Sequence, residues 1–324
     1  MKDLFKRRET SLFVIILILA AAVGFRAHDF VTPGNFLFIF KDSSILFVVS
    51  IGQFLVILTG GIDLSVASIM GFTGMSVALL DKVNPNMPLV VIILAAMAIG
   101  FVLGSFNGLL VSALNIPPII ATLGTLSIYR GFVIVLSGGT WVSADQMAAP
   151  FRDFPQASFL GLSNMICIAI VVFAVFAVFL HLTRKGRDIY GIGGNMLASQ
   201  YVGIDVKKTN FMVFALSGIL SGLAGYLWVA FYASAANDSA AGLELQTVAA
   251  CVVGGVSILG GYGTIAGVLL GSIFIGVVKN ALSMIRISPF WQVAIQGFVI
   301  LLAIVLNTVL DRRAQASMLK RRVL

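Results

Sequence analysis

Long apolar runs follow one another along almost the whole chain, and this feature restricts the fold more than any other. A helix needs about 20 residues to cross the hydrocarbon core of a membrane. Ten runs have the length and composition of candidate spans: residues 11–26, 38–59, 64–80, 88–114, 116–137, 160–182, 210–232, 243–258, 264–284 and 289–310. Of the 324 residues, 59% are hydrophobic and only 10% are charged, whereas a soluble domain has about 25% charged residues. The sequence therefore predicts an all-α polytopic membrane protein with about ten transmembrane helices in a single domain, residues 1–324.

The first apolar run has the layout of a secretory signal peptide as well as that of a first span. It follows a basic start and ends in small residues, as a cleaved signal does. We favour an uncleaved span, because many further spans follow and the ten-span count requires it.

Basic residues are distributed unevenly between the segments that separate the runs. Of the 21 Lys and Arg residues, 14 fall in the N-terminal segment 1–10, the loop 183–209 and the tail 311–324. Ten spans place these three segments on one side of the membrane. Since loops rich in Lys and Arg stay in the cytoplasm, both termini and the loop 183–209 are predicted to be cytoplasmic. The net charge of +8 is explained by this topology, and no nucleic-acid partner is expected.

The motif TGGIDLSVAS, residues 59–68, interrupts the second and third runs. Gly60 and Gly61 are predicted to break the helix, and non-helical backbone survives at membrane depth only where protein or water satisfies its polar groups. Asp63 and Ser65 can cap the following helix through its free N–H groups. Alternatively, the break lines a translocation path, with Asp63 at a gate or facing the solute. Both interpretations remain open at this stage.

A second glycine-rich motif, GGVSILGGYG, breaks the chain again at Gly254 and Gly255. It begins like a phosphate-binding loop, but Gly261 and Tyr262 stand where that loop requires Lys and Ser or Thr. The chain is therefore not expected to bind ATP through this motif. Three glycines four residues apart form a smooth face that suits close helix packing: Gly263, Gly267 and Gly271.

Ionisable residues inside the runs are few, and each is a functional candidate because a charge in the membrane is costly. They are Asp63, Arg130, Glu244 and Lys279. They form no chain of acids and histidines of the kind that carries protons, and the sequence has no HExxH motif. We therefore assign no catalytic residue and no metal ligand.

The stretch GRDIYGIGGNMLASQYVGID, residues 186–205, is a segment of mixed polarity between two runs. Asn195 is placed to cap a short helix that continues to about Val202, with Gly203 placed to end it. Eight residues extend only about 12 Å, too little to cross a membrane. This helix either lies on the membrane or docks a cytoplasmic partner. Docking also explains the basic flanks, so we favour it.

Three blocks of sequence, in this order, resemble the membrane subunits of bacterial ABC sugar importers, the ribose, autoinducer-2 and monosaccharide permease family. They are GGIDLSVAS (60–68), GRDIYGIGGNMLASQYVGI (186–204) and ELQTVAACVVGGVSILGGYGTIAGVLLGS (244–272). The resemblance covers nearly the whole chain. Two positions differ from the family pattern, with Ala67 in place of Gly and Gln246 in place of Asp.

The resemblance implies the ABC importer permease fold, a place in the bacterial inner membrane and a set of partners. Two permease subunits, identical or related, assemble with two cytoplasmic ATPase subunits and receive solute from an extracytoplasmic binding protein. ATP and Mg²⁺ bind to the ATPase, and this chain carries no cofactor. The segment that matches the coupling helix of the family contains Arg187, Asn195, Leu197, Ala198, Tyr201, Gly203 and Ile204.

The sequence therefore predicts a permease subunit that imports a small sugar or sugar-like solute by alternating access. Polar residues at the helix breaks or within a span are the candidates for the translocation path: Asp63, Ser65, Asn107 and Ser257. The alternative is a stand-alone secondary transporter or channel for a small polar solute. An intramembrane enzyme is a third class, for which the sequence offers no catalytic residues.

Overall fold

The computed structural model describes residues 8–288, 290–298, 301, 302 and 305. Eight of the described helices are long and apolar enough to cross a membrane. They are α1 (Arg8–Arg26), α2 (Pro33–Leu58), α3 (Val66–Val83), α4 (Leu89–Ser112), α5 (Pro118–Ser137), α7 (Asn164–Leu182), α10 (Val206–Tyr232) and α12 (Ile265–Met284). Each coincides with a predicted run, so the all-α polytopic class is confirmed.

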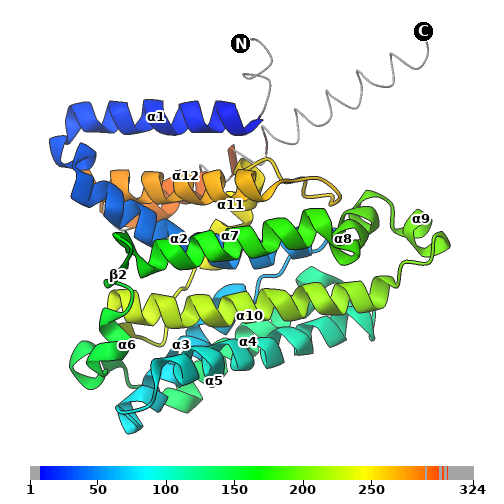
Figure 1. The fold of residues 1–324 in the computed structure, drawn as a ribbon, viewed down its shortest axis with the longest axis horizontal. Helices are drawn as coiled ribbons and strands as arrows, with labels where there is room; N and C mark the ends of the chain where they lie inside the picture. The colour runs from blue at the N-terminus through cyan, green and yellow to red at the C-terminus, as the bar shows by residue number, and fades with distance from the viewer. Residues whose placement is uncertain (1–7, 289, 299–300, 303–304, 306–324) are drawn as a thin grey trace.

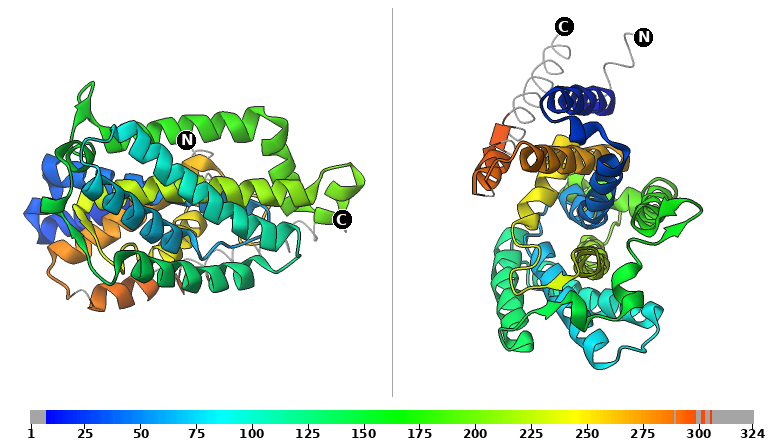
Figure 2. Two further views of the ribbon diagram at one scale, coloured as in Figure 1. Left: turned by 90° about the horizontal axis from the view of Figure 1, so that it is seen from below. Right: turned by 90° about the vertical axis from the view of Figure 1, so that its left-hand side faces the viewer.

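The long helices lie side by side and α10 is at the centre of the bundle (Figures 1 and 2). It packs against α2 on one side and against α3 and α4 on the other. Residues of α2 and α10 are mostly buried, and both helices are less apolar than α4 and α7, whose residues are mostly exposed. In a membrane this burial comes from helix-on-helix packing rather than from exclusion of water.

Helices α4 and α10 are in close contact through four glycines. A Cβ atom on Gly104 would lie 2.7 Å from the Cα of Gly218, and a Cβ on Gly100 would lie 2.8 Å from the Cα of Gly222. On each helix the two glycines are four residues apart, so they lie on one face of that helix. The two backbones are therefore in direct contact, and any side chain larger than hydrogen would separate them.

The predicted span 243–258 is wrong as a continuous helix. Helix α11 covers only Leu243–Val253, about 16 Å at 1.5 Å per residue, which is half of the hydrocarbon core. Gly254 caps its end and Gly255 has a φ of +87°, a conformation that glycine adopts without strain. The predicted break at these two glycines is thus confirmed, but it divides the run into a short helix and a loop.

The glycine face predicted in the second motif is confirmed for two of its three members. A Cβ on Gly271 would lie 2.9 Å from the carbonyl carbon of Ala250, and one on Gly267 would lie 3.1 Å from that of Gly254. Both glycines thus let α12 pack closely against α11. Gly263 precedes α12 and lies in the loop instead.

Two further span boundaries differ from the prediction or fall at the edge of the described structure. The run 160–182 begins as a helix only at Asn164, because β2 (Ser158–Phe159) and β3 (Leu162–Ser163) form a hairpin before it. Residues 290–298 of the predicted span 289–310 are helical, and part of its remainder lies outside the described residues, as do segments 1–7 and 311–324.

Short elements gather at the two ends of the bundle. At one end β1 (Val142–Ser143) pairs antiparallel with β4 (Ser234–Ala235), with Val142 opposite Ala235. The other short elements on this side are η1 (His28–Val31), η2 (Ala144–Gln146) and α6 (Ala149–Asp153). At the opposite end α8 (Arg184–Gly194) follows α7, and α9 (Met196–Tyr201) protrudes beyond the end of α10 (Figure 1).

Candidate functional site

The chain between α2 and α3 leaves the helical conformation just where the first glycine motif begins. Gly60 has a φ of +82°, and the N–H of Gly61 donates to the carbonyl of Val56 at 3.0 Å. Helix α3 starts only at Val66. The predicted break at Gly60 and Gly61 is thus confirmed, and it lies between two buried helices.

Asp63 is fully buried at the centre of this break. Its Oδ1 accepts hydrogen bonds from the backbone N–H and the hydroxyl of Ser65, at 2.9 and 2.6 Å. Its Oδ2 accepts from the hydroxyl of Ser217 on α10 at 3.3 Å. The Ser65 hydroxyl accepts in turn from the side-chain amide of Asn107 on α4 at 2.7 Å. Three of the four candidate path residues are therefore in one hydrogen-bonded cluster.

The two predicted caps of α3 have different outcomes. Asp63 satisfies the free N–H of Ser65, the residue that precedes the helix. The side chain of Ser65 accepts no hydrogen bond from the first turn of α3, because its hydroxyl is already directed to Asp63 and Asn107. The prediction of a Ser65 cap is wrong.

Two more helices hold the backbone of the break. With its amide oriented to satisfy both groups, Gln53 on α2 donates to the carbonyl of Asp63 at 2.7 Å and accepts from its N–H at 3.2 Å. Thr122 on α5 accepts from the N–H of Leu64 at 3.1 Å and is placed to donate to the carbonyl of Ile62 at 3.3 Å. These backbone groups of the break are therefore hydrogen-bonded within the protein, as the membrane interior requires.

Gln53, Thr122 and Ser217 were not among the residues selected from sequence. Each is a polar residue within an apolar helix, and its partner lies in another part of the chain. A buried glutamine between Gly52 and Phe54 is the strongest signal that a sequence analysis could have used, since polar groups in membrane helices mark internal contacts.

Ser257, the fourth path candidate, lies elsewhere. Its N–H donates to the carbonyl of Tyr262 at 3.0 Å, and its carbonyl accepts from the N–H of Gly260 at 3.0 Å. These bonds fold residues 254–264 into a compact loop at the α8 end of α2. Ser257 is therefore part of this loop and not of the Asp63 cluster.

The loop 183–209 contains a helix that the sequence did not reveal, as well as the one it predicted. Thr183 caps α8 by accepting from the N–H of Gly186 at 3.1 Å. One residue separates α8 from α9, and this residue, Asn195, accepts from the N–H of Ala198 at 2.9 Å. The predicted cap is confirmed. Gly203 has a φ of +83° and follows directly on the end of α9, as predicted for its terminator.

The start of α10 is capped in the same way. The Oδ1 of Asp205 accepts from the backbone N–H of Lys208 at 3.0 Å. This hydrogen bond holds the pKa of the Asp205 carboxyl below its usual range. The connection between α9 and α10 thus begins at the glycine that terminates α9 and ends at a side-chain cap.

Helix α9 presents its apolar face outward. The exposed fractions of Leu197, Tyr201 and Val202 are 68%, 92% and 74%, and Ala198 beside them is also exposed. Ser199 on the opposite face is buried against α8. Arg187 is exposed and Ile204 is partly buried. The residues predicted to couple to a partner therefore surround a free apolar surface at the tip of the bundle.

Asn195→Ala is expected to loosen α9 without changing the transmembrane bundle. Loss of an N-cap side chain costs about 1 kcal/mol, and a six-residue helix has few other bonds to offset it. Amide hydrogen exchange should accelerate several-fold in residues 196–201 and stay unchanged in α10. Asn195→Asp, which keeps the cap, is the control. Equal exchange in the alanine variant and the wild-type protein would contradict the capping role.

A cavity of about 280 Å³ lies between the break and α9. Its wall includes Gly60 and Gly61 from the break, Met196 and Gln200 from α9, and Asn210 from α10. The Oδ1 atom of Asn210 is buried and has no hydrogen-bond partner. The lining of the cavity is therefore mixed, with polar side chains among apolar ones, and α9 forms part of its wall.

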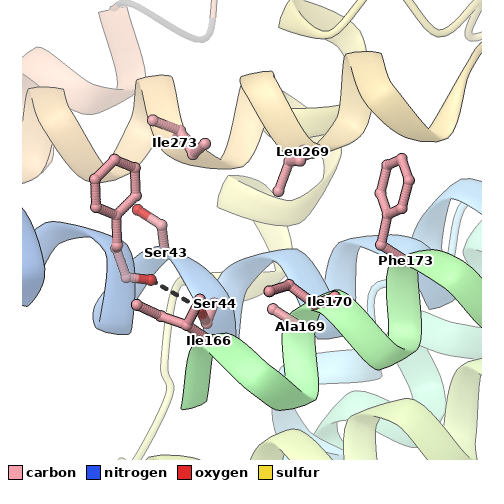
Figure 3. Close-up of a pocket in the computed structure, with 9 residues that line it drawn as sticks. Ser43, Ser44, Ile166, Ala169, Ile170, Phe173, Leu269 and Ile273 are labelled. Carbon is pink, nitrogen blue, oxygen red and sulfur yellow. Dashed lines mark hydrogen bonds between the residues drawn. The ribbon is translucent and has the colours of Figure 1, made fainter. Parts of the chain in front are cut away.

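A second cavity, of about 290 Å³, lies between α2, α7 and α12 (Figure 3). Its lining is almost wholly apolar and includes Ile166, Ile170, Phe173 and Leu269. Ser44 at its edge donates to the carbonyl of Phe40 at 2.7 Å. This cavity has little to offer a polar solute, so we do not place the path there.

Two of the ionisable residues inside the spans have well-defined partners. Lys279 forms an ion pair with Asp42 on α2 at 3.1 Å and is also within hydrogen-bond distance of the Tyr232 hydroxyl, at 3.2 Å. Arg130 donates to the carbonyl of Ser239 at 2.6 Å. Both connect the ends of spanning helices to their neighbours. Among the described residues, no three His, Cys, Asp or Glu side chains are placed to hold a metal ion.

The chain matches a permease family over most of its length. Residues 35–304 fit the family described as "Branched-chain amino acid transport system / permease component". The chain belongs to this permease family. It is a component of a transport system and a multi-pass membrane protein, as its eight apolar helices require.

Similar proteins match the chain in sequence over nearly their full length. The chain is 36% identical to the autoinducer 2 import system permease protein LsrC of Enterobacter sp. (strain 638), over 95% of this chain and 88% of that protein. It is 35% identical to LsrC of Klebsiella pneumoniae subsp. pneumoniae, with the same coverage. Identity to LsrC of Escherichia coli O157:H7 is 32%, over 95% and 89%. No solved structure matches the chain.

Proposed function

We propose that the chain is the permease subunit of an ABC importer for a small sugar-like solute in the bacterial inner membrane. Two permease subunits, identical or related, form the path, and two cytoplasmic ATPases supply ATP hydrolysis with Mg²⁺. An extracytoplasmic binding protein delivers the solute. The observation that carries this proposal is α9, a capped helix whose apolar side chains are exposed beyond the end of the bundle.

The exposed face of α9 requires a protein partner. An apolar surface outside the membrane marks an interaction site, and Leu197 and Tyr201 are large enough to anchor one. Arg187, Lys207 and Lys208 flank this surface, and basic loops stay in the cytoplasm. The partner is therefore a cytoplasmic subunit, and the termini lie on the same side.

The Asp63 cluster has a structural role beside the path, because it holds the break against α4 and α10. Asp63, Ser65 and Asn107 are buried and bonded to one another, so in this conformation they offer no free group to a solute. The cavity next to the break, whose lining includes free polar side chains, is the better candidate for the cytoplasmic end of the path. Its wall includes both the break and α9, so a displacement of α9 changes its shape.

The solute we propose is neutral and rich in hydroxyl groups. The one charged side chain in the lining of the cavity is Lys207, and its other polar side chains are amides and hydroxyls: Thr59, Ser112, Asn115, Gln200 and Asn210. Such groups suit a sugar better than the isolated charges of an amino acid. The relatives are named for autoinducer 2, so this solute is the first to test.

Co-purification tests the proposed partner. The chain is co-expressed with the ATPase encoded in the same gene neighbourhood, and Leu197→Asp is combined with Tyr201→Asp. Placing two carboxylates in a desolvated interface is expected to abolish co-purification and ATP-dependent uptake of autoinducer 2 into proteoliposomes. Val83→Asp and Phe159→Asp alter equally exposed apolar positions outside α9 and should leave the complex intact.

Other results would assign a different function. Uptake by the purified chain without any ATPase would identify a stand-alone transporter or channel and overturn the proposal. Intact co-purification of the double variant would show that the partner docks elsewhere. Turnover of a substrate that is lost with Asp63→Asn would indicate an intramembrane enzyme.

A further inference from the structure

Three segments of backbone meet at the base of α9. They are the end of α2 at Leu58, the end of α8 at Gly193, and the loop between α11 and α12 at Gly260 and Gly261. We call these four residues the glycine junction. The N–H of Gly261 donates to the carbonyl of Leu58 at 3.0 Å, which joins two of the three segments directly.

The backbone of Gly193 packs directly against the other three residues of the junction. A Cβ atom at this position would collide with the carbonyl oxygen of Leu58 and the N–H of Gly261, and would lie 3.0 Å from the carbonyl carbon of Gly260. In the reverse direction, a Cβ on Gly261 would lie 2.8 Å from the carbonyl carbon of Gly193. The contact therefore leaves no room for a methyl group.

A side chain of α8 reinforces this contact. The hydroxyl of Tyr190 donates to the carbonyl of Gly263 at 2.9 Å, in the same loop as Gly260. Ile189 and Ile192 are buried on the same helix. Helix α8 is thus fixed to the loop at two points one turn apart.

Each segment of the junction continues directly into a different part of the molecule. Leu58 is followed by the break that contains Asp63. Gly193 is separated from α9 only by Gly194 and Asn195. Gly261 leads into α12. We infer that Gly193 is the positioning residue that couples α9 to the break and to α12, so that a partner bound at α9 displaces all three together.

This inference rests on the proposed docking of α9, and it assigns the transmission step to one backbone contact. In this part of α8 only the Cβ position of Gly193 is blocked by backbone atoms. A Cβ on the adjacent Gly194 would have no atom within 4 Å, and one on Gly191 would meet only side chains, at 3.4 and 3.5 Å. Gly194 is therefore a matched control in the same helix, one residue away.

Gly193→Ala and Gly194→Ala should separate coupling from assembly. Each variant is reconstituted with the co-expressed ATPase, and uptake of autoinducer 2 is measured per ATP hydrolysed. Gly193→Ala is expected to keep the ATPase bound while this ratio falls about tenfold, within the range of typical allosteric couplings. Gly194→Ala should keep the wild-type ratio. An unchanged ratio in Gly193→Ala, or an equal loss in both variants, would overturn the inference.

A second measurement covers the case in which Gly193→Ala does not fold. Spin labels at Gln200→Cys on α9 and Leu259→Cys on the loop, with Cys167→Ser, report the distance across the intact junction. If the junction moves as a unit, this distance is the same in the nucleotide-free and ATP-bound complexes. A distance that changes between these states overturns the inference even if α9 docks as proposed. Loss of the wild-type ATPase complex would instead overturn the proposed function.

Discussion

Asp63→Leu is expected to abolish uptake and to remove most of the folded protein from the membrane, whereas Asp63→Asn should retain both. Leucine leaves three buried donors without an acceptor: the N–H and hydroxyl of Ser65 and the hydroxyl of Ser217. Each unsatisfied donor costs about 1–3 kcal/mol. Three together remove a large part of the about 5–15 kcal/mol that keeps a domain folded. Asparagine keeps an acceptor oxygen at the same place.

Fluorescence-detected size exclusion and uptake measurements distinguish the two roles of Asp63. Ser217→Ala is the control, because it removes only the longest bond to the carboxylate, at 3.3 Å, and should lower the melting temperature by a few degrees. If Asp63→Asn is well folded but inactive, the charge itself acts on the gate or the solute. The interpretation that the cluster has a purely structural role would then be wrong.

Features that depend on neighbouring residues were predictable from sequence. Asn195 and Gly203 delimit α9 through bonds and backbone angles within a few residues. The break at Gly60 and Gly61 follows the same logic, as does the bond from the N–H of Ser65 to Asp63. In each case the residues that determine the feature lie within a few positions of one another, so the local sequence is enough to predict it.

The partners of these features depend on distant contacts. Ser217 lies 154 residues from Asp63, and nothing within either segment specifies that they meet. Helix α8 was missed for the same reason. Its glycines lower helix propensity, and its stability comes from packing against Leu58 and the loop at Gly260. Those contacts form only when three remote segments come together.

The error at α11 has a different cause. A short helix followed by an apolar loop has the same hydropathy as a continuous span, so the run 243–258 was indistinguishable from its neighbours by composition. The adjacent glycines Gly254 and Gly255 were the sequence signal that the helix ends there. The same uncertainty does not affect α2 or α10. These helices have 26 and 27 residues and contain no two adjacent glycines.

Gly218→Val is expected to eliminate folded protein, and Gly218→Ala to lower the melting temperature by about 3–10 °C. The Cβ of residue 218 would lie 2.7 Å from the Cα and 2.9 Å from the N of Gly104. Both are backbone atoms, so α4 must move away from α10. Overpacking of this kind costs about 1–3 kcal/mol for a small increment, and each kcal/mol shifts the melting temperature by about 2–4 °C in domains of about 150–250 residues.

Gly131→Ala and Gly131→Val are the matched controls, because a Cβ on Gly131 within α5 would have no atom within 4 Å. Both should melt within a few degrees of the wild-type protein. Equal melting of Gly218→Ala and Gly131→Ala would mean that α4 and α10 separate easily and that their contact is not part of the rigid core. Uptake gives a further distinction. Ser217 precedes Gly218 and donates to Asp63, so a displaced α10 also pulls on the break, and uptake by Gly218→Ala should fall further than its folded yield.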